Sequence, residues 1–398
     1  MVDIRSYLKE KKEREQNQTN FRQKLRLHKL TALYRVMLVA VAIIALAALV
    51  MLQYQRHIYT SYDIVSSVER ETSEAATDVR LYDSILTYSK DGAHCTDAKG
   101  NVIWNETYQM QDILIAMNRD VVAIGSYNGR EIYISNTKGQ LGSIDTAMPI
   151  RNIAVSAAGD VTAVLADTNA TWVNTYNSEG ELQSYGETHM KNSGYPAAIS
   201  LSPNGELLAV SYVYIDAGTL KTNVVFYNFG AVGTNQSDYL VSTDTYTDML
   251  IPEIRFMDNE TAYAVGDECL IIYKGGQVPK RLASYYYSQE VQAVFSGDKY
   301  VGLVFTSDEE DSRYRLEVYN TSGELVGKYP FNIEYTDIFF GHDNFTVYNE
   351  KECVITTFKG VEKYNGPFTQ AVNVMIPVGT AYKYLLVTNN YIDTIQLK

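Results

Sequence analysis

The stretch LEVYNTSGELVG, Leu316 to Gly327, has the pattern of a β-hairpin, because apolar and polar residues alternate on both sides of a polar turn that contains Gly323. Similar stretches elsewhere carry their glycines at Gly139, Gly180, Gly276 and Gly360. We expect each glycine to take a positive φ in a tight turn, since a residue without a Cβ atom does so at no steric cost. The recurrence indicates a protein built from repeats.

The repeat unit contains four strands. Around the opening stretch, the segments VQAVFSG, YVGLVFTS, YRLEVYN and ELVGKYPFN predict four short antiparallel strands within about 42 residues. The same order starts again at Ser84, Ile113, Asn152, Ala197, Glu253 and Asp337, with a longer loop expected between the second and third strands of the unit at Ala197. Four strands every 40–45 residues or so are typical of a β-propeller, in which each sheet is buried against its neighbours. We therefore predict an all-β propeller of four-stranded blades in residues 79–398.

The two ends of the propeller predict how the ring closes. The C-terminal segment, residues 371–398, contains three expected strands and no fourth. The segment YDIVSSVER, residues 62–70, is strand-like and belongs to no other unit. Pairing it with the last three strands would leave no open edge. This arrangement gives eight blades, and seven is the alternative if the first unit merges with the last.

Residues 36–55 contain no charged side chain and include VMLVAVAIIALAALVML, Val36 to Leu52. As a helix they cover roughly 30 Å, which is the thickness of a bilayer core. A buried core helix and a cleaved signal peptide are the alternatives. No small-x-small cleavage motif follows Leu52, so we expect an uncleaved transmembrane signal anchor, with the lipid bilayer as its partner.

Charge predicts the topology of this anchor. Residues 1–35 carry ten Lys/Arg and four Asp/Glu, a net charge of +6. The positive-inside rule therefore places a basic tail, residues 1–35, in the cytoplasm and residues 56–398 outside the cell membrane. Residues 56–78 form a juxtamembrane segment that includes the closing strand. The chain as a whole carries −13, which leaves −19 for residues 36–398, and such an acidic body disfavours nucleic acid.

Two resemblances follow from the motifs. CTDAKGNVIWN, Cys95 to Asn105, resembles the repeat of quinoprotein-like (PQQ-type) propellers, in which Asp, a Gly turn and Trp recur in each blade. Here the full pattern occurs once, and Trp172, the only other Trp, precedes its Gly. The ring of tryptophans that docks a quinone is absent, so no cofactor is expected. The pairing of a GH with a WD dipeptide that is typical of WD repeats is also absent.

The whole layout, with its basic tail, single anchor and a propeller opening with ILTYSKDGAHCTDAKGNVIW, resembles an uncharacterised family of single-pass, membrane-anchored extracellular propellers of Gram-positive clostridia. That resemblance implies a place in the cell envelope and implies no activity.

Few side chains suggest a site. The sequence has no HExxH, GxSxG, P-loop or GxGxxG motif, and its cysteines, Cys95, Cys269 and Cys353, form no CxxC. The acidic run Asp308, Glu309, Glu310 and Asp311 is a weak candidate for Ca²⁺, with a solvated hairpin tip as the alternative. The run Tyr285, Tyr286 and Tyr287 is a weak candidate for binding a sugar or a protein. Core positions are the alternative, because successive strand residues face opposite sides.

Two functions of different classes remain. The first is a non-catalytic binding or scaffolding module for a protein or an envelope polymer. The second is an extracytoplasmic glycan hydrolase or lyase with residues from several blades meeting at the central channel. It predicts carboxylates or histidines with a perturbed pKa at one mouth of that channel. The first is expected, although propellers serve many functions.

Overall fold

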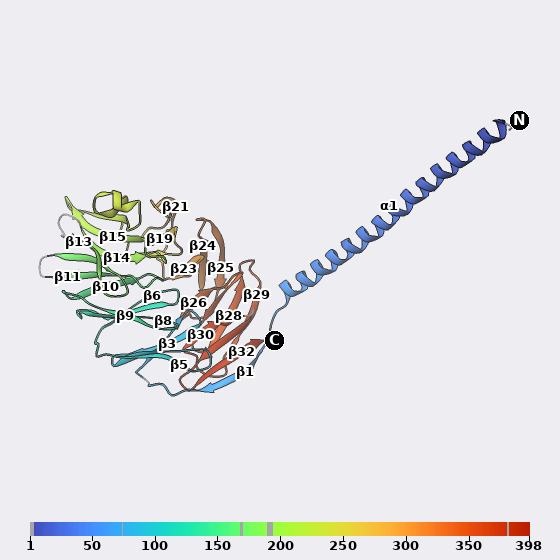
Figure 1. Cartoon of the computed structure of the whole chain (residues 1–398). Coiled ribbons are helices and arrows are strands. Elements are labelled where there is room, and N and C mark those ends of the chain that lie inside the picture. The colour runs from blue at the N-terminus through green and yellow to red at the C-terminus, as the bar shows by residue number, and fades with distance from the viewer. Residues whose placement is uncertain (1–3, 74, 168–169, 189–193, 380–381) are drawn as a thin grey trace. The chain divides into compact units, whose positions relative to one another are not determined.

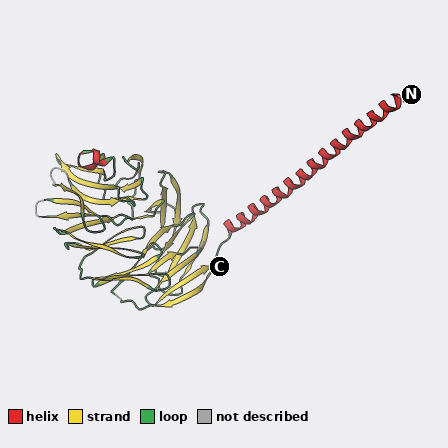
Figure 2. Ribbon diagram, viewed as in Figure 1, coloured by secondary structure: helices red, strands yellow, loops and turns green. Residues whose placement is uncertain are grey.

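The structure, a computed structural model, describes residues 4–398 except 74, 168–169, 189–193 and 380–381. The side chains of residues 5, 17, 19–28, 31–32 and 48–56 are also outside the description. The chain divides into two compact units, Met1–Ile58 and Tyr59–Lys398. The first is helical and the second consists almost entirely of strands, as Figure 2 shows.

The first unit is one helix, α1, Ile4–Arg56. The side chains of residues 36–47 are exposed along it. Within the part of the chain that the structure describes, no helix combines the length and the apolar character needed to cross a bilayer. The last eight residues of the predicted anchor, 48–55, lie where side chains are not described.

The second unit contains eight sheets of four antiparallel strands. Blade 1 consists of β2 (Thr77–Leu81), β3 (Ser84–Ser89), β4 (Gly92–Thr96) and β5 (Val102–Thr107). Blade 2 consists of β6 (Ile113–Asn118), β7 (Val121–Ser126), β8 (Glu131–Asn136) and β9 (Gly139–Asp145). Blade 3 consists of β10 (Ile150–Val155), β11 (Val161–Ala166), β12 (Thr171–Tyr176) and β13 (Leu182–Thr188). Blade 4 consists of β14 (Tyr195–Leu201), β15 (Leu207–Asp216), β16 (Thr219–Asn228) and β17 (Leu240–Thr247). Between β16 and β17 lie two short 3₁₀ helices, η1 (Gly233–Asn235) and η2 (Ser237–Tyr239).

The remaining blades repeat this order. Blade 5 consists of β18 (Glu253–Phe256), β19 (Thr261–Val265), β20 (Cys269–Lys274) and β21 (Lys280–Tyr286). Blade 6 consists of β22 (Ala293–Ser296), β23 (Tyr300–Thr306), β24 (Tyr314–Asn320) and β25 (Leu325–Phe331). Blade 7 consists of β26 (Asp337–Phe340), β27 (Asn344–Tyr348), β28 (Glu352–Thr357) and β29 (Glu362–Pro367). Blade 8 consists of β30 (Val374–Pro377), β31 (Lys383–Val387), β32 (Tyr391–Leu397) and β1 (Tyr62–Glu69). The prediction of eight blades is confirmed, and the alternative of seven is excluded.

The ring closes within blade 8. Strand β1 pairs antiparallel with β32 from Tyr62 opposite Leu397 to Glu69 opposite Tyr391, and Figure 1 shows the two strands side by side. The spare segment in the sequence is therefore the outer strand of the last blade. A sheet that joins both ends of the unit leaves no blade incomplete.

Buried apolar side chains hold each blade against the next. Among the described residues, eight such clusters occur, and each combines residues of two neighbouring blades. The cluster that seals the ring contains Ile85 of blade 1 and Val374 of blade 8. Apolar burial therefore stabilises the complete ring, including the junction between its first and last blades.

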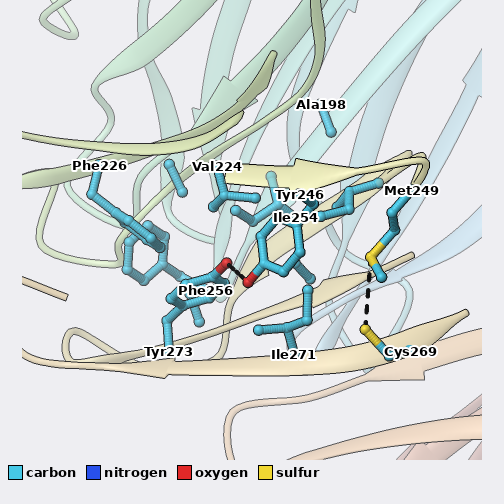
Figure 3. Close-up of a cluster of buried hydrophobic side chains, with 14 of the residues drawn as sticks. Ala198, Val224, Phe226, Tyr246, Met249, Ile254, Phe256, Cys269, Ile271 and Tyr273 are labelled. Atoms are coloured by element: carbon cyan, nitrogen blue, oxygen red, sulfur yellow. Dashed lines mark hydrogen bonds between the residues drawn. The ribbon is translucent and has the colours of Figure 1, made fainter. Parts of the chain in front are cut away.

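The junction between blades 4 and 5 shows how polar atoms enter this core (Figure 3). The rings of Phe226 and Tyr273 lie 5.0 Å apart. The hydroxyls of Tyr246 and Tyr273 are 2.7 Å apart and satisfy each other. Cys269 donates to the sulfur of Met249 at 3.7 Å. Tyr246, Tyr273 and Cys269 thus have partners for their polar atoms within this junction, which offsets the cost of removing those atoms from water.

The recurrent glycines have two physical roles. Gly100, Gly180, Gly323 and Gly360 take positive φ values of 78°, 84°, 74° and 77° in the turns before the fourth strands. A Cβ atom at Gly180 would lie 2.8 Å from the carbonyl oxygen of Ser143, which belongs to the preceding blade. The turn glycine therefore also permits close contact between blades.

Two of the predicted glycine positions differ from this pattern. Gly139 has a φ of 158°, close to extended backbone, and is already the first residue of β9. Gly276 has no positive φ, because its neighbour Gly275, with a φ of 141°, takes the unusual conformation in that turn. The prediction was wrong for Gly276.

Candidate functional site

The two faces of the propeller carry different connections. The first strands of several neighbouring blades contact one another, so these strands surround the central axis. Because strands alternate in direction, turns between second and third strands share one face with the connections between blades. We call this the upper face. The lower face carries the turns between first and second strands and between third and fourth strands.

On the lower face, the β6–β7 turn of blade 2 reaches across the axis. The amide Nδ2 of Asn118 donates to the carbonyl oxygens of Val155 and Leu201, at 3.1 and 3.3 Å, which end the first strands of blades 3 and 4. Nη2 of Arg255, on blade 5, donates to the carbonyl oxygen of Met117 at 3.3 Å. One turn therefore connects the lower ends of four blades.

The next residue of this turn, Arg119, lines a polar cavity of about 410 Å³. The other lining residues come from blades 5 and 6: Asp258, Asp298, Lys299, Tyr300, Asn320, Thr321 and Ser322. Blades 2 and 6 are opposite each other in a ring of eight, so residues from both sides of the ring line this cavity. Ligand sites commonly occupy concave places of this size where polar groups converge.

The walls of the lower-face cavity are ordered by their own hydrogen bonds. Oδ1 of Asp258 accepts from the backbone N–H groups of Glu260 and Thr261, at 2.8 and 2.6 Å. Oδ1 of Asn320 accepts from the backbone N–H groups of Ser322 and Glu324, at 2.9 and 3.0 Å. These bonds hold the turns of blades 5 and 6 in place without any ligand.

On the upper face, two carboxyl groups begin the first strands of blades 5 and 7. Burial raises the pKa of Glu253, while the hydroxyl of Tyr263, donating at 2.7 Å, lowers it in part. Burial also raises the pKa of Asp337, and the nearby guanidinium of Arg80 opposes this change. These are perturbed carboxyls of the kind that the enzyme hypothesis predicts.

Glycan hydrolysis needs two carboxyl groups about 5–10 Å apart that act on one bond. The pKa shifts of Glu253 and Asp337 arise from burial and from different neighbours, Tyr263 for Glu253 and Arg80 for Asp337 among them. His94, whose pKa is lowered chiefly by burial, lies on β4, the third strand of blade 1.

The most prominent feature of the upper face is the β15–β16 hairpin of blade 4. Its two strands have ten residues each and pair from Leu207 opposite Asn228 to Asp216 opposite Thr219. The first strand of the blade pairs only as far as Val213. The hairpin therefore extends beyond its own inner strand. The sequence led us to expect a loop here, but the alternating pattern continues and the strands are simply longer.

The overhanging part of this hairpin carries an apolar pair. Ile215 is opposite Leu220 on the two strands, and Ile215 is 70% exposed. Other exposed aromatic side chains occur at the upper ends of strands: Tyr127 follows β7, Tyr195 begins β14 and Tyr286 ends β21. The guanidinium of Arg151 lies 5.0 Å from the ring centroid of Tyr127. Exposed apolar and aromatic groups of this kind are typical of protein-binding surfaces.

The three predicted tyrosines separate by strand alternation. Tyr285 donates to the carbonyl oxygen of Gly323, and its ring lies 4.6 Å from that of Tyr319 in blade 6. Tyr287 also packs into the junction between blades 5 and 6. Tyr286, between them, is 70% exposed. The structure packs two of these rings, half-buried, against the core between blades 5 and 6 and leaves the third exposed.

The predicted acidic run forms the exposed tip of the β23–β24 hairpin on the upper face. The carboxylate of Asp308 pairs with Arg315 at 2.7 Å, and the backbone oxygen of Asp311 accepts from Asn332. Glu309 and Glu310 are exposed beside them. In the described ranges, no group of three His, Cys, Asp or Glu side chains gathers as a metal ion would require. All three cysteines are buried and free.

Sequence reasoning did not identify the lower-face cavity. Its residues come from blades 2, 5 and 6, and no local motif joins positions so far apart in the chain. One signal was present: the two-residue turn after Asn118 begins with Arg119, although glycine or asparagine is preferred there.

Residues 54–397 match the sequence model of a family described as a family of unknown function, DUF5711. The chain belongs to this family. The expectation of a propeller family without an assigned activity agrees with this match. A search of functionally curated proteins finds no match.

This DUF5711 chain is similar in fold to several solved structures. Sqt1 from Chaetomium thermophilum has a TM-score of 0.50 at 13% identity and covers 85% of this chain and 100% of its own. BamB from Moraxella catarrhalis covers the same shares with a TM-score of 0.49 at 11% identity. The β-propeller domain of Cps50 (Swd1) from Myceliophteria thermophila also covers 85% of this chain and 100% of its own, with a TM-score of 0.44 at 9% identity. At these identities the likeness concerns the fold alone.

Proposed function

We propose that this protein is a scaffold, anchored in the cell membrane and facing outward, that binds a partner protein through the upper face of its propeller. The observation that carries the proposal is the overhanging β15–β16 hairpin with its apolar pair, in which Ile215 is 70% exposed and Leu220 is half-buried. An apolar pair on a projecting hairpin contributes little to the propeller's own core. It stabilises the protein only when a partner covers it.

The chemistry of the upper face fits a protein partner. Tyr286 is 70% exposed and Tyr127 is 42% exposed beside the guanidinium of Arg151. Tyrosine and arginine are enriched among the residues that contribute most to protein association. Residues 36–398 carry a net charge of −19, the difference between −13 for the chain and +6 for its tail. This charge favours a partner with a basic rim around an apolar centre.

The proposed location rests on the N-terminal unit. Residues 36–55 carry no charge, and the side chains of Val39 and Ile43 are 59% and 61% exposed along α1. Exposed apolar side chains on a long helix find a suitable environment in lipid. The basic tail supports a cytoplasmic N-terminus and an extracytoplasmic propeller.

The proposal is tested by crosslinking the full chain to its neighbours on intact cells and comparing three forms. The wild type should yield a defined crosslinked protein. Ile215→Asp should reduce the yield of this crosslinked protein by about tenfold or more, because a charge replaces the apolar centre of the contact. Val65→Asp is the matched control, since Val65 is 59% exposed on the outer strand β1, away from the upper-face turns.

Three results would contradict the proposal. Equal crosslinking by wild type and Ile215→Asp would place the partner elsewhere. Capture of an envelope polymer by the same surface would replace the protein partner. Failure of external reagents to reach the propeller on intact cells would overturn its location.

A further inference from the structure

The lower-face cavity contains charged side chains that the fold does not use. Arg119, Lys299 and Asp298 all line it. Among the residues that the structure describes, none of these three side chains makes a hydrogen bond or an ion pair within 4 Å, although cations and carboxylates share one cavity. Asp298 and Lys299 are consecutive residues of the β22–β23 turn of blade 6, and Arg119 comes from the β6–β7 turn of blade 2. All three side chains are exposed, so the fold leaves charges of both signs available at this cavity.

The backbone of Arg119 takes an unusual conformation in a turn that its neighbours hold in place. Its φ is 53°, in the left-handed region where a residue with a Cβ atom is strained. Glycine would adopt this turn more easily. Seven other non-glycine residues of the described chain also have a positive φ, and Tyr82 has it in the corresponding turn of blade 1. Asn118 and the Met117 carbonyl bind blades 3, 4 and 5, so the turn that presents Arg119 is fixed in place.

The chemistry of the lining decides the class of ligand. The cavity presents two cations, Arg119 and Lys299, and two carboxylates, Asp258 and Asp298. An anion alone would meet the two carboxylates, and a cation alone would meet the guanidinium and the ammonium. A molecule with both charges satisfies all four. A volume of about 410 Å³ accommodates such a ligand at the size of an amino acid or a very short peptide.

We propose that the lower-face cavity is a binding site for a small zwitterion, such as a free amino acid or a short peptide with free ends. The ligand carboxylate is held by Arg119 and Lys299, and its ammonium group by Asp258 and Asp298. The ring of Tyr300, which packs 4.5 Å from that of Phe358, forms an ordered wall for the rest of the molecule. This site is independent of the upper face.

The test is isothermal titration calorimetry of the full chain in detergent. The probes are the free amino acids, alanyl-alanine with free ends, the same dipeptide blocked at both ends, and glucose. A free amino acid or the free dipeptide should bind, and blocking its ends should weaken binding by about tenfold or more, since charge-assisted hydrogen bonds are lost. Asp298→Asn should weaken binding to a similar extent.

Arg119→Gly gives a further readout. It should weaken binding by about tenfold while leaving Tm unchanged or raised, because it removes the guanidinium and relieves the strained backbone. Tyr82→Gly is the matched control. Tyr82 has a φ of 57° in the corresponding turn of blade 1 and does not line the cavity. The Tm of Tyr82→Gly should therefore also stay unchanged or rise, while its affinity for the free-ended probes should equal that of wild type.

The proposal is overturned if no free-ended probe binds, if the blocked dipeptide binds as tightly as the free one, or if glucose binds instead. Equal affinity of Arg119→Gly and wild type would also overturn it. None of these results bears on the partner surface of the upper face, because that surface is tested separately by crosslinking of the Ile215→Asp variant.

Discussion

The guanidinium of Arg70 donates to both carboxylate oxygens of Asp78, at 2.8 and 3.1 Å, across the junction where the ring closes. Arg70 directly follows β1, the outer strand of blade 8, and Asp78 lies on β2, the first strand of blade 1. Their side chains are 11% and 0% exposed. Asp78 also accepts from Thr87 at 2.6 Å and from Asn373 at 2.9 Å. A buried charge with this many partners specifies one geometry for the junction.

We expect Arg70→Ala to lower the free energy of unfolding by about 3–5 kcal/mol, because it leaves the Asp78 carboxylate buried and without its cation. Urea denaturation of the full chain measures the change. Asp216→Asn is the matched control. Asp216 pairs with Lys221 at 2.6 Å on the exposed hairpin, and losing that pair should change stability little. Similar losses in both variants would argue against a special role of the buried pair.

Two of the glycine turns allow two contributions to stability to be measured separately, the close contact between blades and the left-handed backbone. Gly180→Ala should destabilise the propeller by more than Gly360→Ala. Both residues have positive φ, so each substitution costs about 1–2 kcal/mol of backbone strain. A Cβ atom at Gly180 also meets the Ser143 oxygen at 2.8 Å, whereas at Gly360 it has no neighbour within 4 Å. Thermal unfolding of both variants provides the comparison, and equal Tm values would show that blade contact contributes nothing.

Glu253 predicts a pH dependence of stability. Burial raises its pKa above the ordinary value of 4.5, so the folded protein retains this proton to a higher pH than the unfolded chain does. Between these two pKa values the folded state binds more protons, and the free energy of unfolding therefore falls as pH rises through that window.

Glu253→Gln should remove this part of the pH dependence. The variant should gain stability relative to wild type at neutral pH and show no gain below pH 4.5, the ordinary pKa of the side chain. Urea denaturation of the variant and of wild type, from below pH 4.5 to neutral pH, measures this difference in the free energy of unfolding. Glu268→Gln is the control, because Glu268 is an exposed glutamate of the same blade. A constant difference between Glu253→Gln and wild type at every pH would contradict the raised pKa.

The proposed anchor predicts the effect of charges within residues 36–55. Substituting arginine for both Ile43 and Leu46 should release the protein from the membrane fraction, because each arginine near the middle of a span costs about 2.5–3.5 kcal/mol. Sedimentation after an alkaline carbonate wash measures the release. Leu8→Arg, at an exposed position of the same helix outside the expected span, should stay with the membrane. Retention of the double variant would exclude this segment as the anchor.

Several features of the molecule followed from local patterns in the sequence. The alternation in LEVYNTSGELVG has a period of two, so it predicts strands and a turn without knowledge of any other blade. The spare segment at 62–70 predicted the closing strand, because an odd strand at one end matches a missing strand at the other. Alternation also predicted that the Tyr285–Tyr287 run would divide between core and surface, although it did not say that Tyr286 would be the exposed residue.

The repeat and the four-stranded blade could be predicted from the sequence, since both depend on interactions between neighbours along the chain. The sequence left eight and seven blades open, and the structure shows eight. Which side chains meet across the ring became known from the folded structure. Arg255 contacts Met117 over 138 positions, and the cavity beside them draws on blades 2, 5 and 6. The reason is geometric: a closed ring brings opposite blades together at its axis, and no local periodicity encodes that distance.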